Sequence, residues 1–526
     1  MYRDPGSANR LKYRSQRQSL AGIVADIFDG EHYQRLQSDY VTIDDETLDH
    51  QYFSHPNDVA LSLCTDGFEP FKTRKQACWP LILINYDLPP SIQTRLKNIL
   101  CVGVIPGPKQ PKELDAFLEP LIEELETLAC GVPAFDSTTG SPFKLHAYLL
   151  ACFGDMPANW NRAKGWEDKL CPPLTHSALI RVPGLDFPRL FPHDFMHMMF
   201  ENVVTNLLDI WTRSGDWADF GTDLDPYLLQ PEAFREIGKS CAASGNTIPS
   251  AFGCRVPDLK EKRGESSAES TLLFATLLGP ALLCDCFRYT RYYQHFVQLV
   301  SLINKCIGFE FTREEIQEIL PLFPDVRACT LPLHALLHVA DNIKAMGPVW
   351  CYWAFPMELF CGPLARCCMN RRFPYLSFNR RLLQVAQLSQ IKHIYGLAEE
   401  LNLDEQGENI LKGTSYDGYP NLVFVGPGRR TVLEPKLQRQ VIKYISRQTN
   451  VPHHAERTAL VTRPLQIWGK MQRLDTSIGG DRIGGDVVRG ALVSPRHNQN
   501  SRDTSHVWEL VGLYKRHNQR LIRKLR

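Results

Sequence analysis

The chain has 526 residues, 44% of them hydrophobic and 22% charged, with a formal net charge of +1. This length allows two or three domains with a substantial core, and the composition excludes a disordered or fibrous protein. The charge is uneven: from Asn421 to the end, 20 Lys and Arg against 7 Asp and Glu give +13, which leaves −12 for the first 420 residues. A basic tail suits a polyanion such as nucleic acid, although a solvated end has the same composition.

The sequence indicates an intracellular protein without a membrane span. Its longest uncharged apolar run, "TLLFATLLGPALLC", is too short to cross a bilayer, and "MYRDPGSANR" lacks the apolar core of a signal peptide. The 16 cysteines are scattered. Cys284-x-Cys286 and Cys367-Cys368 lack the two-residue spacing of zinc ligands, so we expect reduced thiols.

The first part of the chain predicts an order of strand, strand, strand, helix, strand. The apolar run before "CTDGF" is the first strand, "WPLILINYDLPP" the second and "NILCVGVIPGPK" the third. In "KELDAFLEPLIEELETLACGV" apolar residues recur at three and four, which predicts an amphipathic helix that ends at Gly131. After "FDSTTGSPF", which we expect to be a turn-rich connector, "KLHAYLLACFGDMPA" predicts the fourth strand.

An acidic residue follows the first strand of this order and another follows the last. Asp66 follows the first strand and Asp155 follows the fourth. The ribonuclease H-like fold has the same order of elements, and its first and fourth strands are neighbours. Their carboxylates can then share two divalent metal ions about 4 Å apart. Each acid taken alone is also explained as a turn former or helix cap.

Candidate residues also occur in the helical part that follows. Asp194 and His197 in "FPHDFMHMMFENVV" share a helix face at i and i+3, as a functional pair or as a helix-start acid and a core histidine. His334 and His338 have metal-ligand spacing, but no Glu accompanies them, which favours core histidines. The aromatic residues of "RYYQHF" suit packing, or less often stacking on bases. Glu358 is the lone acid in an aromatic and apolar window, where a carboxylate must be paired, protonated or metal-bound.

Taken in order, "LCTDGFEPF", "WPLILINYDLPP", "VGVIPGPKQPKELDAFLEPLIEEL", "GDMPA", "FPHDFMHMMFENVV", "SGNTIPSAFG", "LPLHALLHVADNI" and "GPVWCYWAFPMELFCG" resemble the transposase of CACTA (En/Spm-type) DNA transposons. The form with "SGNTIPSAFG" and "YWAFPME" is similar to that of mushroom-forming fungi. The resemblance covers roughly residues 40–400. It implies a nuclear DDE/D-type enzyme that cuts transposon ends and joins them to target DNA with two Mg²⁺ or Mn²⁺ ions.

The resemblance also assigns residues to roles. Asp66, Asp155 and Glu358 match the three catalytic, metal-binding acids, and Asp194 and His197 match the acid-x-x-His pair of the family. The implied fold is mixed α/β, a ribonuclease H-like catalytic core with a large helical insertion and a basic C-terminal extension. A homo-oligomer is left open, and no membrane is expected.

We expect five regions along the chain. They are a lead segment (1–58), the first part of the core (59–165), a helical insertion shortened at its start (166–345), a closing helical part with the third acid (346–400) and a basic extension (401–526).

Three features depart from the family pattern. Only 38 residues separate Asp155 from Asp194, a single Cys171 remains where family members have cysteine pairs, and Leu359 stands where an Arg commonly follows the third acid. The alternative is therefore a truncated or domesticated relic that binds DNA without cutting it. A deleted copy that does not fold stably is a third reading, because loss of a strand exposes a sheet edge.

Overall fold

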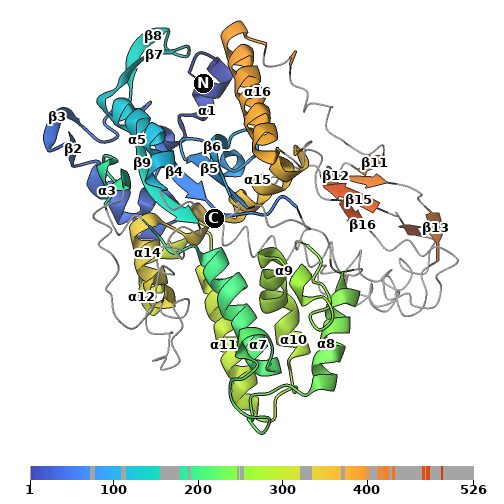
Figure 1. Ribbon diagram of the computed structural model, residues 1–526. Helices are drawn as coiled ribbons and strands as arrows, with labels where there is room; N and C mark the ends of the chain where they lie inside the picture. Colours follow the sequence, from blue (N-terminus) through green and yellow to red (C-terminus); the bar gives the residue numbers. More distant parts are fainter. Residues whose placement is uncertain are drawn as a thin grey trace. The chain divides into compact units, whose positions relative to one another are not determined.

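The structure is a computed structural model. It describes residues 2–71, 77–107, 114–154, 178–186, 191–245, 248, 254–319, 335–368, 373–397 and 400–401, and in the last part 413–416, 419–425, 429–432, 465–467, 470–473 and 487–489. The chain divides into two compact units (Figure 1). The first comprises residues 1–237 and 264–402, and the second comprises residues 238–263 and 403–526.

A four-stranded mixed sheet forms the centre of the first unit. Its order is β6 (Leu100–Pro106), β5 (Cys78–Asn85), β4 (Val59–Thr65) and β9 (Ala147–Gly154). β4 pairs with β5 antiparallel and with β9 parallel, and β5 pairs with β6 antiparallel. All residues of β4 and β9 are buried, in keeping with the continuous apolar runs of their sequences.

The predicted strands and helix occur in the predicted order, with the short helix α4 (Pro90–Gln93) added between β5 and β6 and a hairpin added before β9, and the first strand pairs with the last. The predicted amphipathic helix is α5 (Asp115–Cys130), which contacts β9. It ends where predicted: Gly131 has φ +92°, a conformation that glycine adopts without strain.

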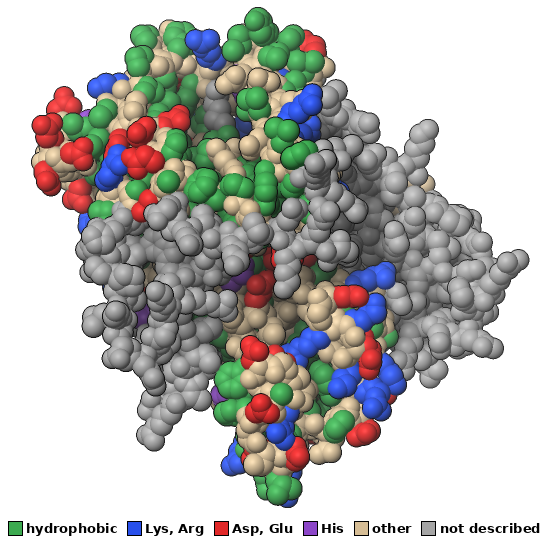
Figure 2. All heavy atoms as spheres, in the orientation of Figure 1, with side chains coloured by type: hydrophobic (Ala, Val, Ile, Leu, Met, Phe, Trp, Pro, Cys, Tyr) green, Lys and Arg blue, Asp and Glu red, His purple; other side chains and the backbone are tan. Residues whose placement is uncertain are grey.

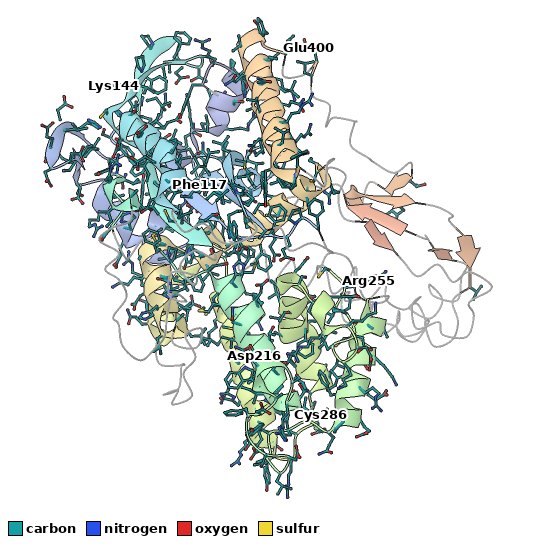
Figure 3. The ribbon with its side chains drawn as sticks, viewed as in Figure 1. Phe117, Lys144, Asp216, Arg255, Cys286 and Glu400 are labelled. Atoms are coloured by element: carbon teal, nitrogen blue, oxygen red, sulfur yellow. The ribbon has the colours of Figure 1, made fainter. Side chains whose placement is uncertain are left out.

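The segment before the fourth strand differs from the prediction. The expected turn-rich connector is a β-hairpin of β7 (Val132–Asp136) and β8 (Ser141–Leu145), and β9 starts only after His146. Gly140 supplies the positive φ of the turn, and Figure 3 labels Lys144 on β8. The end of β8 and β9 read as one strand in the sequence because no turn residue separates Leu145 from Ala147.

The lead segment is folded against the rest of the first unit. The elements of this segment are α1 (Pro5–Arg10), α2 (Tyr13–Gln16), β1 (Ile23–Val24), η1 (Ile27–Asp29), α3 (Glu31–Leu36), β2 (Tyr40–Ile43) and β3 (Glu46–Gln51). Arg14 is buried and pairs with the buried Asp87 at 3.0 Å. β1 pairs with β10 (Phe311–Thr312), nearly 290 residues later in the chain.

The β2–β3 hairpin carries a strongly acidic surface. Figure 2 shows acidic side chains gathered over it, and Asp39, Asp44, Asp45, Glu46 and Asp49 are all exposed. A surface of this sign repels phosphate groups, so a nucleic acid would have to approach the unit elsewhere.

Helices dominate the part between the sheet and the third predicted acid. They are η3 (Ala178–Arg181), η4 (His197–Val203), α7 (Val204–Thr212), η5 (Gly215–Trp217), α8 (Pro231–Ser244), η7 (Arg263–Glu265), α9 (Ala268–Leu273), η8 (Phe274–Leu278), α10 (Gly279–Leu282), α11 (Thr290–Cys306), α12 (Arg313–Ile319), η10 (Leu336–His338) and α14 (Val339–Met346). In "RYYQHF" Phe296 is buried against Trp211 of α7, which is the packing role expected for it. Figure 3 labels Asp216 and Cys286 in this part.

Two helices close the first unit. The turn η11 (Val349–Cys351) leads into α15 (Phe355–Arg366), and α16 (Pro374–Tyr395) follows. α16 contacts β6, and Phe378 of α16 packs with Leu364 of α15 on Cys78 of β5. α15 is thereby fixed to the sheet that carries Asp66.

In the second unit, β11 (Thr414–Tyr416), β12 (Tyr419–Val425), β15 (Lys470–Arg473) and β16 (Val487–Arg489) form an antiparallel sheet, and β13 (Arg429–Thr431) pairs with β14 (Leu465–Ile467). Most of the basic extension expected at 401–526 lies outside the described residues. The five predicted regions stay a prediction. Among the helices that the structure describes, none is long and apolar enough to cross a membrane.

Candidate active site

Asp66 lies directly after β4, at the point where the chain leaves the sheet. Its side chain is 15% exposed. Close packing fixes the turn after it: Phe68 and Cys78 exchange two backbone hydrogen bonds of 3.0 Å, and a Cβ on Gly67 would lie 2.5 Å from Nε1 of Trp79. Asp66 is thus held at a sheet edge rather than in an open loop.

The partner strand ends at the same edge. Thr65 of β4 pairs with Gly154 of β9, so the residues that precede Asp66 and Asp155 in the sequence are opposite each other. Gly154 has φ +118°, and a Cβ there would lie 2.0 Å from the carbonyl oxygen of Thr65. Only glycine allows the two strands to end this closely. Asp155 itself lies outside the described residues.

His197 connects Asp66 to Asp194. Its Nε2 lies 3.0 Å from Oδ2 of Asp66, and its Nδ1 bonds Oδ2 of Asp194. Burial disfavours the charged imidazolium, but the two carboxylates outweigh burial and raise the pKa of His197 above its usual value. The sequence placed Asp194 and His197 on one face, and the structure brings that face to Asp66.

Asp194 is a buried structural acceptor as well as the partner of His197. Its Oδ1 accepts hydrogen bonds from the backbone nitrogens of Met196 at 3.1 Å and Ala354 at 3.0 Å. Ala354 is the residue before α15, the helix that carries Glu358. Asp194 therefore fixes the start of one helix and the start of another, 160 residues apart in the sequence.

Glu358 lies in the first turn of α15 and is partly buried. Burial raises the pKa of its carboxyl to about 7, and nearby Glu201, Asp66 and Asp194 act in the same direction, while His197 opposes them. Glu358 is therefore close enough to Asp66 to feel its charge, and its role as the third acid stays a prediction. The carboxyl groups around Glu358 therefore outnumber the one cationic side chain, that of His197.

Sequence reasoning missed Glu201. It lies one helical turn after His197, with Oε2 3.8 Å from Nε2 of that histidine, and its side chain is 42% exposed. The i, i+4 spacing of His197 and Glu201 is the signal that could have found it, because residues four apart share a helix face.

The donor chemistry of this group suits a divalent cation. Carboxylate oxygens are the ligands that Mg²⁺ and Mn²⁺ prefer, and a cation would offset both the burial and the neighbouring carboxylates that raise the pKa of Glu358. Within the described ranges no three His, Cys, Asp or Glu side chains already have the geometry of a metal site. His197 bonds Asp66, and Asp155 is beyond those ranges.

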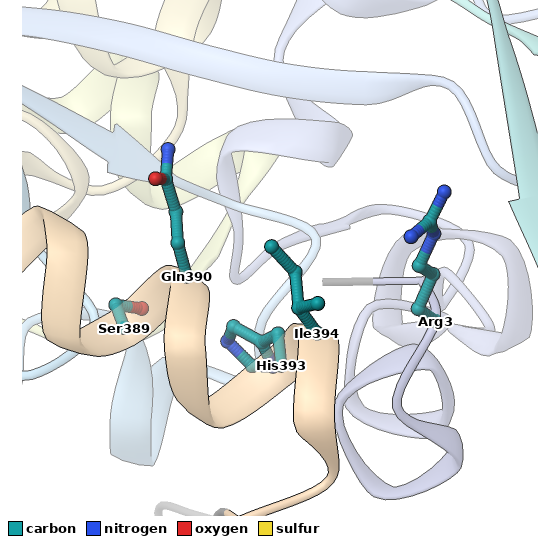
Figure 4. A pocket seen from close by; sticks show the side chains of 5 residues that line it. All are labelled: Arg3, Ser389, Gln390, His393 and Ile394. Atoms are coloured by element: carbon teal, nitrogen blue, oxygen red, sulfur yellow. The ribbon is translucent and has the colours of Figure 1, made fainter.

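The remaining candidates are two histidines and a cavity. His334 is outside the described residues, and the ring of His338 stacks on His193 with centroids 5.6 Å apart, in keeping with a packed histidine. A cavity of about 340 Å³ between α16 and the lead segment is lined by Arg3, Ser389, Gln390, His393 and Ile394 (Figure 4). None of the predicted site residues lines it.

Comparison with known proteins gives a match to one family. Residues 37–173 match the model of a transposase family, "Transposase family tnp2". The matched segment includes the four strands of the central sheet and both Asp66 and Asp155. No curated protein matches the chain. The similarity supports a transposase, and DNA is the partner on which this class of protein acts.

Proposed function

We propose that this protein is a DDE/D-type DNA transposase of the CACTA kind, of the form spread through mushroom-forming fungi, that acts in the nucleus. It cuts phosphodiester bonds at transposon ends, and the freed 3′-hydroxyl then attacks target DNA. The pairing of Thr65 with Gly154 carries the proposal, because it directs the strand ends before Asp66 and Asp155 to one edge of the sheet.

The sheet supports a ribonuclease H-like core. Three strands are consecutive and antiparallel, and the fourth lies parallel to the first on its free side. This order accounts for acids 89 positions apart in the sequence serving one site. The match to a transposase family over the same segment supports the same reading.

Asp66 and Glu358, together with Asp155, are the residues that would hold the cations. When bound, two divalent ions activate the attacking water and stabilise the leaving 3′-oxygen. Nε2 of His197 contacts the Asp66 carboxylate, and Asp194 fixes the ring through Nδ1. Through Ala354, Asp194 also sets the start of the helix from which Glu358 extends.

Nicking of supercoiled plasmid by the full chain tests this function. We expect nicking in Mg²⁺ or Mn²⁺, none in chelator, and loss by at least about 100-fold in Asp66→Ala and Glu358→Gln, because metal-held phosphoryl transfer depends on both acids. Asp49→Ala removes a fully exposed acid on β3 and should nick normally.

DNA binding without nicking in any metal would overturn the enzymatic proposal. Binding that weakens steeply with salt and on removal of the residues after Tyr514 would then indicate the binding relic.

A further inference from the structure

The helix that carries His197 is widened at the site. η4 is a π-helical turn, in which Asn202 Nδ2 donates to the carbonyl of His197 at 2.8 Å and Thr205 Oγ1 donates to that of Phe200 at 3.0 Å. π-helical turns occur frequently at functional sites. Here two side chains stabilise the widened turn on which His197 and Glu201 both lie.

The imidazole of His197 has one nitrogen bonded to a single acid and the other nitrogen facing two acids. Nδ1 is held by Asp194, whose other oxygen is committed to two backbone nitrogens. Nε2 faces two acids: Asp66 at 3.0 Å, within hydrogen-bond distance, and Glu201 at 3.8 Å, just beyond it. A small movement of the more exposed Glu201 side chain would bring it within reach.

The bond from His197 competes with the proposed role of Asp66. An oxygen that accepts a hydrogen bond from the imidazolium has less electron density to give to a cation. Suppose that the Asp66 carboxylate rotated to bind a cation and no other acceptor took its place. The Nε2 proton of His197 would then be left without a hydrogen-bond acceptor in a largely buried site, which is unfavourable.

From this geometry we propose that Glu201 is the alternate acceptor for His197: it takes the Nε2–H bond when Asp66 binds a divalent cation. Glu201 is a positioning residue and touches neither the cation nor the DNA. This inference rests on the proposed function, because it assumes that Asp66 is a metal ligand.

Manganese binding to the full chain, measured by electron paramagnetic resonance and calorimetry, tests the exchange without relying on activity. We expect Glu201→Ala to weaken Mn²⁺ binding by about 10- to 100-fold, as is typical for the loss of a residue that supports a metal ligand. Glu201→Gln keeps an acceptor oxygen and should lose less Mn²⁺ affinity than Glu201→Ala. Glu124→Ala, on the exposed face of α5, is the matched control and should bind normally.

The decisive comparison is the effect of Glu201→Ala on Mn²⁺ affinity in the wild-type chain and in the His197→Ala variant. Without the imidazole there is no N–H to exchange, so adding Glu201→Ala should change Mn²⁺ affinity less than about 2-fold, a coupling that a merely structural glutamate would not show. Equal loss in both backgrounds would make Glu201 a direct ligand and overturn the exchange. Unchanged affinity in both backgrounds would also overturn it.

The failure of the exchange can be told from failure of the proposed function. If the wild-type chain binds no Mn²⁺, or binds it as tightly after Asp66→Ala, the metal-dependent function fails and the exchange with it. If Asp66→Ala abolishes binding while Glu201→Ala does not affect it, only the exchange fails. Circular dichroism of each variant checks that it is folded.

Discussion

The carboxylate of Asp194 accepts a hydrogen bond from the backbone nitrogen of Ala354 at 3.0 Å. This contact joins the helix of His197 to the start of α15, which carries Glu358. Because Asp194 also holds the His197 ring, one buried acid determines where two of the candidate site residues lie.

Replacement of Asp194 should therefore cost stability as well as site geometry. We expect Asp194→Ala to lower the free energy of unfolding by about 3–5 kcal/mol, since it removes one of the two carboxylates that pair with His197 and leaves two backbone donors unsatisfied. Asp194→Asn keeps an acceptor oxygen and should cost about 1–2 kcal/mol. Urea unfolding measures both, with the exposed Asp216→Ala as control. Equal stability of Asp194→Ala and wild type would contradict this role.

Glu358 gives the metal-free protein a pH dependence. Its pKa is raised from 4.5 to about 7 in the folded state. Between these values the folded chain holds a proton that the unfolded chain has released, so stability falls as pH rises through this window. Glu358→Gln should remove this part of the fall, about 1 kcal/mol between pH 5 and 8 after screening by solvent is counted.

Thermal unfolding of the wild type and of Glu358→Gln in chelator, from pH 4.5 to 8, measures how much of the pH dependence Glu358 contributes. In wild type, added Mn²⁺ should reverse the fall above pH 7, because a cation favours the ionised carboxylate. Parallel curves for wild type and variant would mean that Glu358 is not buried as described.

Gly154 is required where β4 and β9 end. In Gly154→Ala the new methyl group would meet the Thr65 carbonyl, and φ +118° is strained for alanine, so we expect a loss of about 2–4 kcal/mol. Gly140→Ala is the matched control: its φ is +67° but no atom lies within 4 Å, so only the backbone strain of about 1 kcal/mol applies. Chemical denaturation compares the two, and equal losses would show that the close approach of the strands is unimportant.

The lead segment should be an integral part of the first unit. Arg14 donates to Asp87 and to the carbonyls of His55, Pro56 and Asp58. Arg14→Ala leaves the Asp87 carboxylate buried without its cation, which should cost about 3–5 kcal/mol.

The exposed Arg10→Ala controls for loss of charge near the N-terminus and should change stability by less than about 0.5 kcal/mol. The double variant Arg14→Ala/Asp87→Asn should recover part of the loss, because the neutral amide needs no cation. If the stability losses of the two single changes simply add in the double variant, Arg14 and Asp87 do not interact as an ion pair.

Local patterns in the sequence determined the elements of the central sheet. Runs of apolar residues predicted β4, β5 and β6, the three-and-four spacing predicted α5, and the acid after a buried strand singled out Asp66. These signals are local, because side-chain periodicity and turn chemistry act over a few residues. The β7–β8 hairpin escaped prediction for the same reason: nothing local separates β8 from β9.

Tertiary structure alone decided which of these residues meet. The bond of His197 to Asp66 spans 131 positions, that of Ala354 to Asp194 spans 160, and β1 pairs with a strand near residue 311. Such contacts depend on how helices and strands pack, which no short window of sequence encodes. The sequence therefore identified the acids as candidates, and only the packing of η4 and α15 beside β4 brought His197 to Asp66 and Glu358 near Asp66.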